Sequence, residues 1–167
     1  MARIRILLAD DHTLFRQGVK TLLSAETDME IVGEACDGIG AADKTAELKP
    51  DVVLLDIGMP GPGSFETARQ IKRTRPETRV LFLTMYDDED YLVESMEVGA
   101  SGYVLKDSPS TQLVAAVRDV CRGGSYLSPR MLSQLVDDFR TRVKTTDRMP
   151  RFATLTPREK EVLKMLA

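Results

Sequence analysis

The stretch RIRILLADDHTLF, from Arg3 to Phe15, joins a largely apolar run to two adjacent carboxylates. A run such as residues 4–9, bounded by polar residues, is typical of a buried β-strand. Asp10 and Asp11 follow it directly. Two like charges about 4 Å apart repel by roughly 4 kcal/mol at an effective dielectric constant near 20. The sequence therefore predicts that something close to the end of this strand offsets the repulsion.

Four more apolar, β-rich runs follow, and segments with helical spacing lie between them. The expected strands are residues 4–9, 30–35, 51–55, 79–84 and 101–105. Strands that alternate with helices predict βαβ units and a parallel sheet with helices on both faces. The alternation ends near residues 123–124, so we predict one complete doubly wound α/β domain with five parallel strands.

A different pattern begins after this domain. Ser128 and Pro129 are typical of the start of a helix, and an apolar stripe follows, formed by Leu132, Leu135, Val136, Phe139 and Val143. Residues 144–153 have the composition of a basic, exposed linker. Thr156 and Glu159 then form a capping-box pattern that starts a further helix, inside which the chain stops.

Composition favours a globular protein of the cytoplasm. The 167 residues are 43% hydrophobic and 29% charged, with a net charge of −3, which provides no global basic field for nucleic acid. Cys36 and Cys121 show no metal or redox spacing, so we expect free thiols. No segment reads as a signal peptide or a membrane span.

Polar side chains stand at the ends of four expected strands. Asp10 and Asp11 follow the first strand, Asp56 the third, Thr84 ends the fourth and Lys106 follows the fifth. In an open parallel sheet these ends form one ligand-binding edge. Carboxylates bind Mg²⁺ together with phosphate oxygens, and aspartate is a nucleophile that forms aspartyl phosphate. The pattern predicts a metal-assisted transfer of a phosphoryl group to a carboxylate.

Five motifs carry a resemblance to a known family. The segments ILLADDH, DVVLLDIGMPG, LFLT and GASGYVLKD together resemble the receiver domain of bacterial two-component response regulators. LTPREKEVL resembles the start of the helix-turn-helix module of the NarL/FixJ (LuxR-type) class. The resemblance implies a flavodoxin-like, CheY-like receiver over residues 1–125. It also implies a linker helix and basic linker over 126–153, and an incomplete helix-turn-helix domain over 154–167.

The resemblance also implies roles for individual residues. Asp56 matches the phosphoacceptor, and Lys106 matches the phosphate-binding lysine. The implied site for Mg²⁺ or Mn²⁺ comprises Asp11 and Asp56 as direct ligands, Asp10 through water and the carbonyl of Gly58. Thr84 and Tyr103 match the switch pair, in which the threonine moves to the phosphate and the ring turns inward.

The sequence departs from the class pattern in one loop. Residues 62–64 read Pro-Gly-Ser, where the class usually has a pair such as Asn-Gly or Asp-Gly. We expect a stiffer loop there and an altered contact with the kinase.

The implied function is regulation of transcription under the control of a sensor histidine kinase, with dimerisation on phosphorylation. Helix-turn-helix proteins read DNA with a second helix. Residues 154–167 supply one helix at most, so we expect no DNA-reading residue in this chain. The chain is not expected to be an enzyme, and at most it is expected to catalyse its own phosphorylation and dephosphorylation.

Two alternatives stay open at this point. One is a Mg²⁺-dependent phosphohydrolase with an aspartyl-phosphate intermediate, although such enzymes carry their carboxylates as D-x-D on one strand. The other is a stand-alone receiver that acts by protein–protein contact. His12 reads as a structural residue at a helix start rather than a phosphoryl relay, and Tyr86 is a candidate shield for the phosphate.

Overall fold

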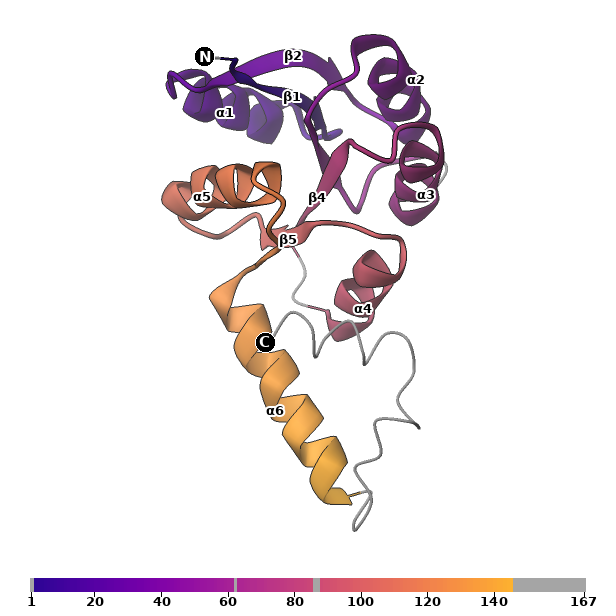
Figure 1. Cartoon of the computed structure of the whole chain (residues 1–167), viewed down its shortest axis with the longest axis vertical. Coiled ribbons are helices and arrows are strands. Elements are labelled where there is room, and N and C mark those ends of the chain that lie inside the picture. Colours follow the sequence, from indigo (N-terminus) through magenta and orange to yellow (C-terminus); the bar gives the residue numbers. More distant parts are fainter. Residues whose placement is uncertain (1, 62, 86–87, 146–167) are drawn as a thin grey trace.

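The computed structural model describes residues 2–61, 63–85 and 88–145. Six parallel strands form one sheet in the order β2-β1-β3-β4-β5-β6 (Figure 1). The strands are β1 (Ile4–Ala9), β2 (Met29–Ala35), β3 (Val52–Asp56), β4 (Arg79–Thr84), β5 (Gly102–Leu105) and β6 (Tyr126–Leu127). The helices are α1 (Thr13–Ser24), α2 (Gly38–Leu48), α3 (Ser64–Thr74), α4 (Glu89–Glu97), α5 (Ser110–Cys121) and α6 (Pro129–Thr145).

The predicted doubly wound fold is confirmed, and the sheet has one additional short strand. β6 has two residues and pairs with β5 through Gly102↔Tyr126 and Tyr103↔Leu127. A two-residue strand is too short to produce a periodic pattern in the sequence. The predictions for Tyr86, Pro62 and residues 146–167 lie outside the described residues.

Two hydrophobic layers cover the two faces of the sheet. Successive strand side chains point to opposite faces, so Leu7 and Val53 pack in one cluster and Leu8 and Leu54 in the other. The first cluster includes residues of α2, α3, α4 and α6, and the second includes residues of α1 and α5. Because both faces are buried, the central strands are apolar without alternation.

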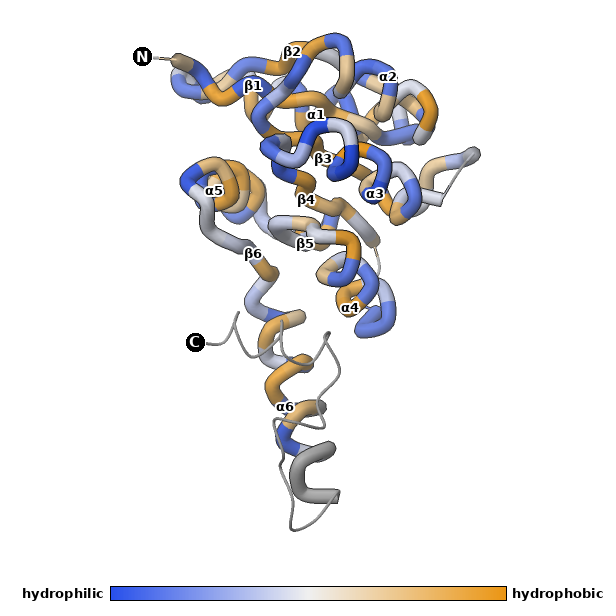
Figure 2. Tube along the Cα trace, turned by 45° about the vertical axis from the view of Figure 1, so that its right-hand side comes forward, coloured by the Kyte–Doolittle hydropathy of each residue, from blue (hydrophilic) through white to orange (hydrophobic). Residues whose placement is uncertain are grey.

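The linker helix α6 starts at Pro129 as predicted and is anchored to the sheet. The N–H of Leu105 in β5 donates to the hydroxyl of Ser128 at 3.3 Å. Met131 and Leu135 are buried in the first hydrophobic cluster, whereas Leu132 of the predicted stripe is only partly buried. Beyond this contact α6 extends away from the sheet (Figure 1), and the part of the helix that is coloured in Figure 2 carries both apolar and hydrophilic segments.

None of the described helices is both long enough and apolar enough to cross a membrane.

Candidate functional site

The strand register brings the predicted polar residues to one edge of the sheet. Ala9 of β1 pairs with Leu55 of β3, so the carboxylates that follow these two residues lie on neighbouring strands. Thr84 of β4 pairs with Leu105 of β5, and Lys106 comes directly after that pair. The predicted convergence of the strand ends is therefore present in the structure.

Three carboxylates and one imidazole lie together at this edge. Potential ligand atoms of Asp10, Asp11, His12 and Asp56 are within 4.8 Å of one another. Asp10 is fully buried, the side chain of Asp56 is 4% exposed, and that of Asp11 is 32% exposed. The cluster thus has a buried floor and an open rim.

Lys106 neutralises the buried floor of the site. Its Nζ lies 2.7 Å from Asp10 Oδ2 and 3.2 Å from Asp56 Oδ1, and its side chain is 3% exposed. Burial, followed by the negative charge of Asp10, raises the pKa of Asp56, and the nearby ammonium of Lys106 opposes that rise. This ammonium therefore offsets part of the negative charge at the end of the first strand, through its contact with Asp10.

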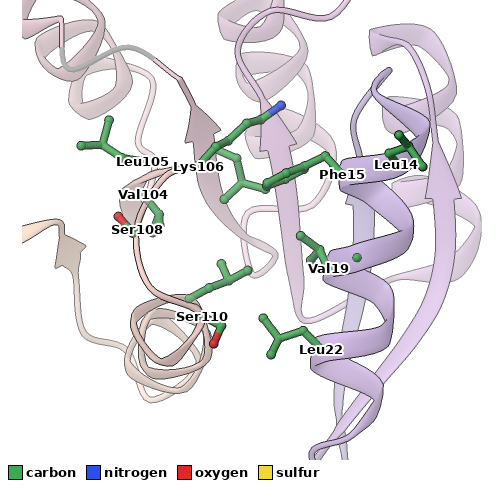
Figure 3. Close-up of a pocket in the computed structure, with 12 residues that line it drawn as sticks. Leu14, Phe15, Val19, Leu22, Val104, Leu105, Lys106, Ser108 and Ser110 are labelled. Carbon is green, nitrogen blue, oxygen red and sulfur yellow. The ribbon is translucent and has the colours of Figure 1, made fainter.

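The stem of Lys106 runs along an apolar groove between α1 and α5. Its Nζ lies 4.5 Å from the centroid of the Phe15 ring, a cation–π arrangement. The groove has a volume of about 340 Å³ and is also lined by Leu22 and Leu113 (Figure 3). These apolar walls cover the lysine stem and leave the charged end directed at the carboxylates.

Ser64 fixes the loop that follows β3, a role that the sequence did not indicate. Its hydroxyl lies 2.6 Å from the carbonyl oxygen of Asp56 and 2.9 Å from that of Ile57, and the residue is buried. The N–H of Gly58 donates to Asp56 Oδ1 at 3.3 Å. The departure from the class pattern at residues 62–64 thus provides a hydroxyl that anchors the end of β3. The predicted metal-binding role of the Gly58 carbonyl stays a prediction.

Arg16 stabilises the turn after β1, which is a second role that the sequence did not predict. Its Nη1 donates to the carbonyl oxygen of Asp10 at 2.5 Å, and its Nε donates to Glu34 Oε1 at 3.1 Å. Lys20 of the same helix also contacts Glu34, at 3.1 Å. Side chains on α1 therefore connect the acidic turn to β2, through contacts between residues far apart in the sequence.

His12 is the N-cap residue of α1, at the helix start that the sequence predicted, and its side chain lies at the rim of the site among the carboxylates. Its backbone N–H donates to Asp10 Oδ1 at 2.8 Å. Its Nδ1 lies 3.1 Å from the same oxygen and 3.4 Å from Asp11 Oδ1, and the side chain is 64% exposed. Asp10 and Asp11 directly precede His12 in the sequence, whereas the proximity of Asp56, at 3.9 Å, arises from the packing of β3 beside β1.

The two residues of the predicted switch pair occupy different surroundings. Thr84 is buried at the end of β4, and its carbonyl oxygen accepts the N–H of Lys106 at 2.7 Å. Tyr103 is 1% exposed and belongs to the first hydrophobic cluster, so its ring already lies inward. Their roles as a switch pair stay predictions.

The donor set fits a divalent cation. Within the described parts of the chain, Asp56 Oδ2 is buried without a hydrogen-bond partner, a costly condition for a carboxylate oxygen. The neighbouring carboxylates of Asp10 and Asp11 are hard oxygen donors, the kind that Mg²⁺ prefers. A cation beside Asp56 Oδ2 would satisfy this atom and reduce the net negative charge of the cluster.

Known proteins resemble this chain over most of its length. The family model of the response regulator receiver domain matches residues 6–118. Oxygen regulatory protein NreC of Staphylococcus carnosus (strain TM300) is 40% identical over 167 residues, covering 98% of this chain and 77% of that protein.

Solved structures show the same likeness. A LuxR-family two-component response regulator from Aurantimonas sp. SI85-9A1 aligns with a TM-score of 0.80 and 33% identity, over 83% of this chain and 99% of that one. The RcsB response regulator of Salmonella typhimurium aligns with a TM-score of 0.77 and 25% identity, over 99% of this chain and 78% of that one.

Proposed function

The chain belongs to the response regulator receiver domain family, as a two-component regulator of the LuxR type, and we propose that Asp56 is its phosphoacceptor. A sensor histidine kinase is the proposed donor. The observation that supports this assignment is the environment of the two carboxylate oxygens of Asp56. One of its oxygens faces the Lys106 ammonium at 3.2 Å, and the other is buried without a hydrogen-bond partner among the described residues.

The proposed step is a phosphoryl transfer between two side chains. An oxygen of the Asp56 carboxylate attacks the phosphorus of a phosphohistidine. The new O–P bond forms as the N–P bond breaks, and the electron pair of the broken bond stays on the leaving imidazole nitrogen. Lys106, already 3.2 Å from Asp56, supplies a compact positive charge for a phosphate oxygen, and the Thr84 hydroxyl is a donor for another.

The proposed metal ligands are the carboxylates of Asp11 and Asp56, the carbonyl of Gly58, and Asp10 through water. Mg²⁺ or Mn²⁺ fits this oxygen-rich set. When bound, the ion supplies positive charge that stabilises the transferring phosphoryl group. Asp10 meanwhile keeps Lys106 in place through the 2.7 Å contact between Oδ2 and Nζ.

The proposed output follows from the phosphorylated state. We assign residues 1–125 to the receiver, 126–153 to a linker and 154–167 to the first helix of a helix-turn-helix domain. Thr84 and Tyr103 are the proposed switch pair, and homodimerisation is the proposed response to phosphorylation. Binding to promoter DNA is proposed only for a protein with a complete C-terminal module. To move a two-state equilibrium from 1:99 to 99:1, phosphorylation must favour the active state by about 5.5 kcal/mol.

The family is not one of classical enzymes, and the chain is proposed to catalyse no reaction beyond its own phosphorylation and dephosphorylation. A cytoplasmic location is part of the same proposal. A phosphohydrolase is less well supported, because the carboxylates Asp10 and Asp56 come from separate strands. Such an enzyme is expected to carry its two carboxylates as D-x-D at the end of one strand, which differs from the arrangement of this cluster.

Intact-mass spectrometry after incubation with acetyl phosphate and Mg²⁺ tests the assignment. Wild type is expected to gain one phosphate that survives acid and is lost in base, whereas Asp56→Asn gains none. An equal gain in both proteins, or no gain in wild type, would refute the assignment. Turnover of a small phosphate ester by wild type would support the phosphohydrolase instead.

A further inference from the structure

His12 and Lys106 contact opposite oxygens of the same two carboxylates. Lys106 Nζ lies against Asp10 Oδ2 and Asp56 Oδ1. His12 Nδ1 faces the other pair, at 3.1 Å from Asp10 Oδ1 and 3.9 Å from Asp56 Oδ2. The oxygens that the ammonium leaves uncovered are therefore those that face an imidazole nitrogen.

These separations suit atoms that share one metal ion. Two ligand atoms about 2.0–2.1 Å from a common ion are about 3 Å apart at a right angle and somewhat farther apart at a tetrahedral angle. His12 Nδ1 lies 3.1 Å from Asp10 Oδ1 and 3.4 Å from Asp11 Oδ1, close to those values. The 3.9 Å distance to Asp56 Oδ2 requires a small inward movement of a side chain that is 64% exposed.

The Nδ1 atom of His12 is not required as a donor to Asp10, because the backbone N–H of His12 already donates to Asp10 Oδ1 at 2.8 Å. Nδ1 also lies 3.4 Å from the Nζ of Lys106, so a metal ion bound to the neutral imidazole would replace that contact with the ammonium. Asp56 Oδ2 is the independent observation that points to a ligand here, because it is buried without a hydrogen-bond partner within the described residues.

We propose that His12 Nδ1 is a further metal ligand, which gives this site a preference for divalent transition ions that accept nitrogen. The proposal rests on the metal site proposed above and adds selectivity to it. Imidazole suits ions such as Ni²⁺ and Zn²⁺, whereas Mg²⁺ prefers oxygen. With Mg²⁺ the imidazole therefore stays outside the coordination shell, and with Ni²⁺ it enters.

Calorimetric titration of the chain without a histidine tag tests this, using Ni²⁺ and Mg²⁺ as probes. His12→Gln keeps a polar side chain but removes the imidazole. We expect it to weaken Ni²⁺ binding by at least about tenfold, on the scale of a lost supporting contact in a metal site, with the Mg²⁺ affinity changed less than about twofold. The control Asp56→Asn is expected to weaken binding of both ions.

The outcomes separate this proposal from the one on which it rests. Equal losses for Ni²⁺ and Mg²⁺ in His12→Gln, or no loss for either, would overturn the role of His12 while leaving the carboxylate site in place. If wild type bound neither ion, or if Asp56→Asn bound both as wild type does, the metal site itself would be refuted.

Pulsed electron paramagnetic resonance with Cu²⁺, a paramagnetic ion that accepts imidazole nitrogen, gives a direct readout of the same bond. The chain contains one histidine, so an imidazole-nitrogen coupling to the bound ion can come from His12 alone. Wild type is expected to show that coupling, and His12→Gln is expected to lack it. A spectrum of bound Cu²⁺ without imidazole-nitrogen coupling in wild type would contradict the proposal.

Discussion

Replacing Lys106 by methionine removes the ammonium between Asp10 and Asp56 while keeping a side chain of similar length. At the observed distances of 2.7 and 3.2 Å, each ion pair is worth about 5–6 kcal/mol at an effective dielectric constant of about 20. Part of this lost Coulomb energy is offset, because the uncharged methionine avoids the desolvation cost of a buried ammonium. Breaking a buried pair costs about 3–5 kcal/mol net, and we expect Lys106→Met to lower the free energy of unfolding by that amount.

Urea denaturation at pH 7 measures this change, first with EDTA and then with saturating Mg²⁺. The difference from wild type is expected to narrow with Mg²⁺, since a cation can replace the lost charge and binding to the folded state stabilises it. Lys20→Met is the matched control. This lysine is 51% exposed and pairs with Glu34, so its loss should cost no more than about 1 kcal/mol.

The reasoning would be refuted if Lys106→Met and Lys20→Met lost the same small amount of stability in EDTA. It would also be refuted if the loss in Lys106→Met stayed the same with and without Mg²⁺. In either case, Lys106 would not be the counter-ion of the buried carboxylates.

Three further predictions concern stability. Asp56→Asn should raise the free energy of unfolding in EDTA at pH 7, because burial raises the folded-state pKa of Asp56 and the ionised wild type is therefore penalised above that pKa. In denaturation at several pH values, the gain should shrink as the pH falls from the folded-state pKa to the lower unfolded-state pKa, and it should be absent below the latter. Ser64→Ala removes a buried hydroxyl that contacts the carbonyls of Asp56 and Ile57, and should cost about 0.5–1.5 kcal/mol in urea and slow phosphate uptake. Leu135→Ala should lower the free energy of unfolding by about 2–5 kcal/mol in the same assay, because Leu135 is buried. The control Leu132→Ala should lower it by less, because Leu132 is partly exposed. Equal losses in the two variants would contradict the observed docking of α6.

The sheet and its polar edge were predictable because each follows from a local pattern. Uninterrupted apolar runs predicted the buried strands, and the geometry of a parallel sheet brings the ends of those strands together. The positions of Asp10, Asp56 and Lys106 therefore followed from their places in the sequence alone. Their proposed roles in phosphorylation are a separate matter and stay predictions.

The supporting contacts of the site could not be predicted in this way. Arg16 reaches Glu34 across 18 positions, and Ser64 reaches Asp56 across eight; such contacts leave no periodic signal. The buried face of α6 includes Met131, which the predicted stripe omitted, because neighbouring elements decide which side of an amphipathic helix is covered. Of the carboxylates near His12, only Asp56 comes from β3, and its approach to the histidine depends on strand packing rather than on a local pattern.

Locating the phosphate on the chain tests the central claim most directly. After incubation with acetyl phosphate and Mg²⁺, borohydride converts an aspartyl phosphate to homoserine, and peptide sequencing by mass spectrometry finds the modified position. The account predicts homoserine at Asp56 and nowhere else. Homoserine at Asp10, at Asp11 or at another residue, or none at all, would contradict it.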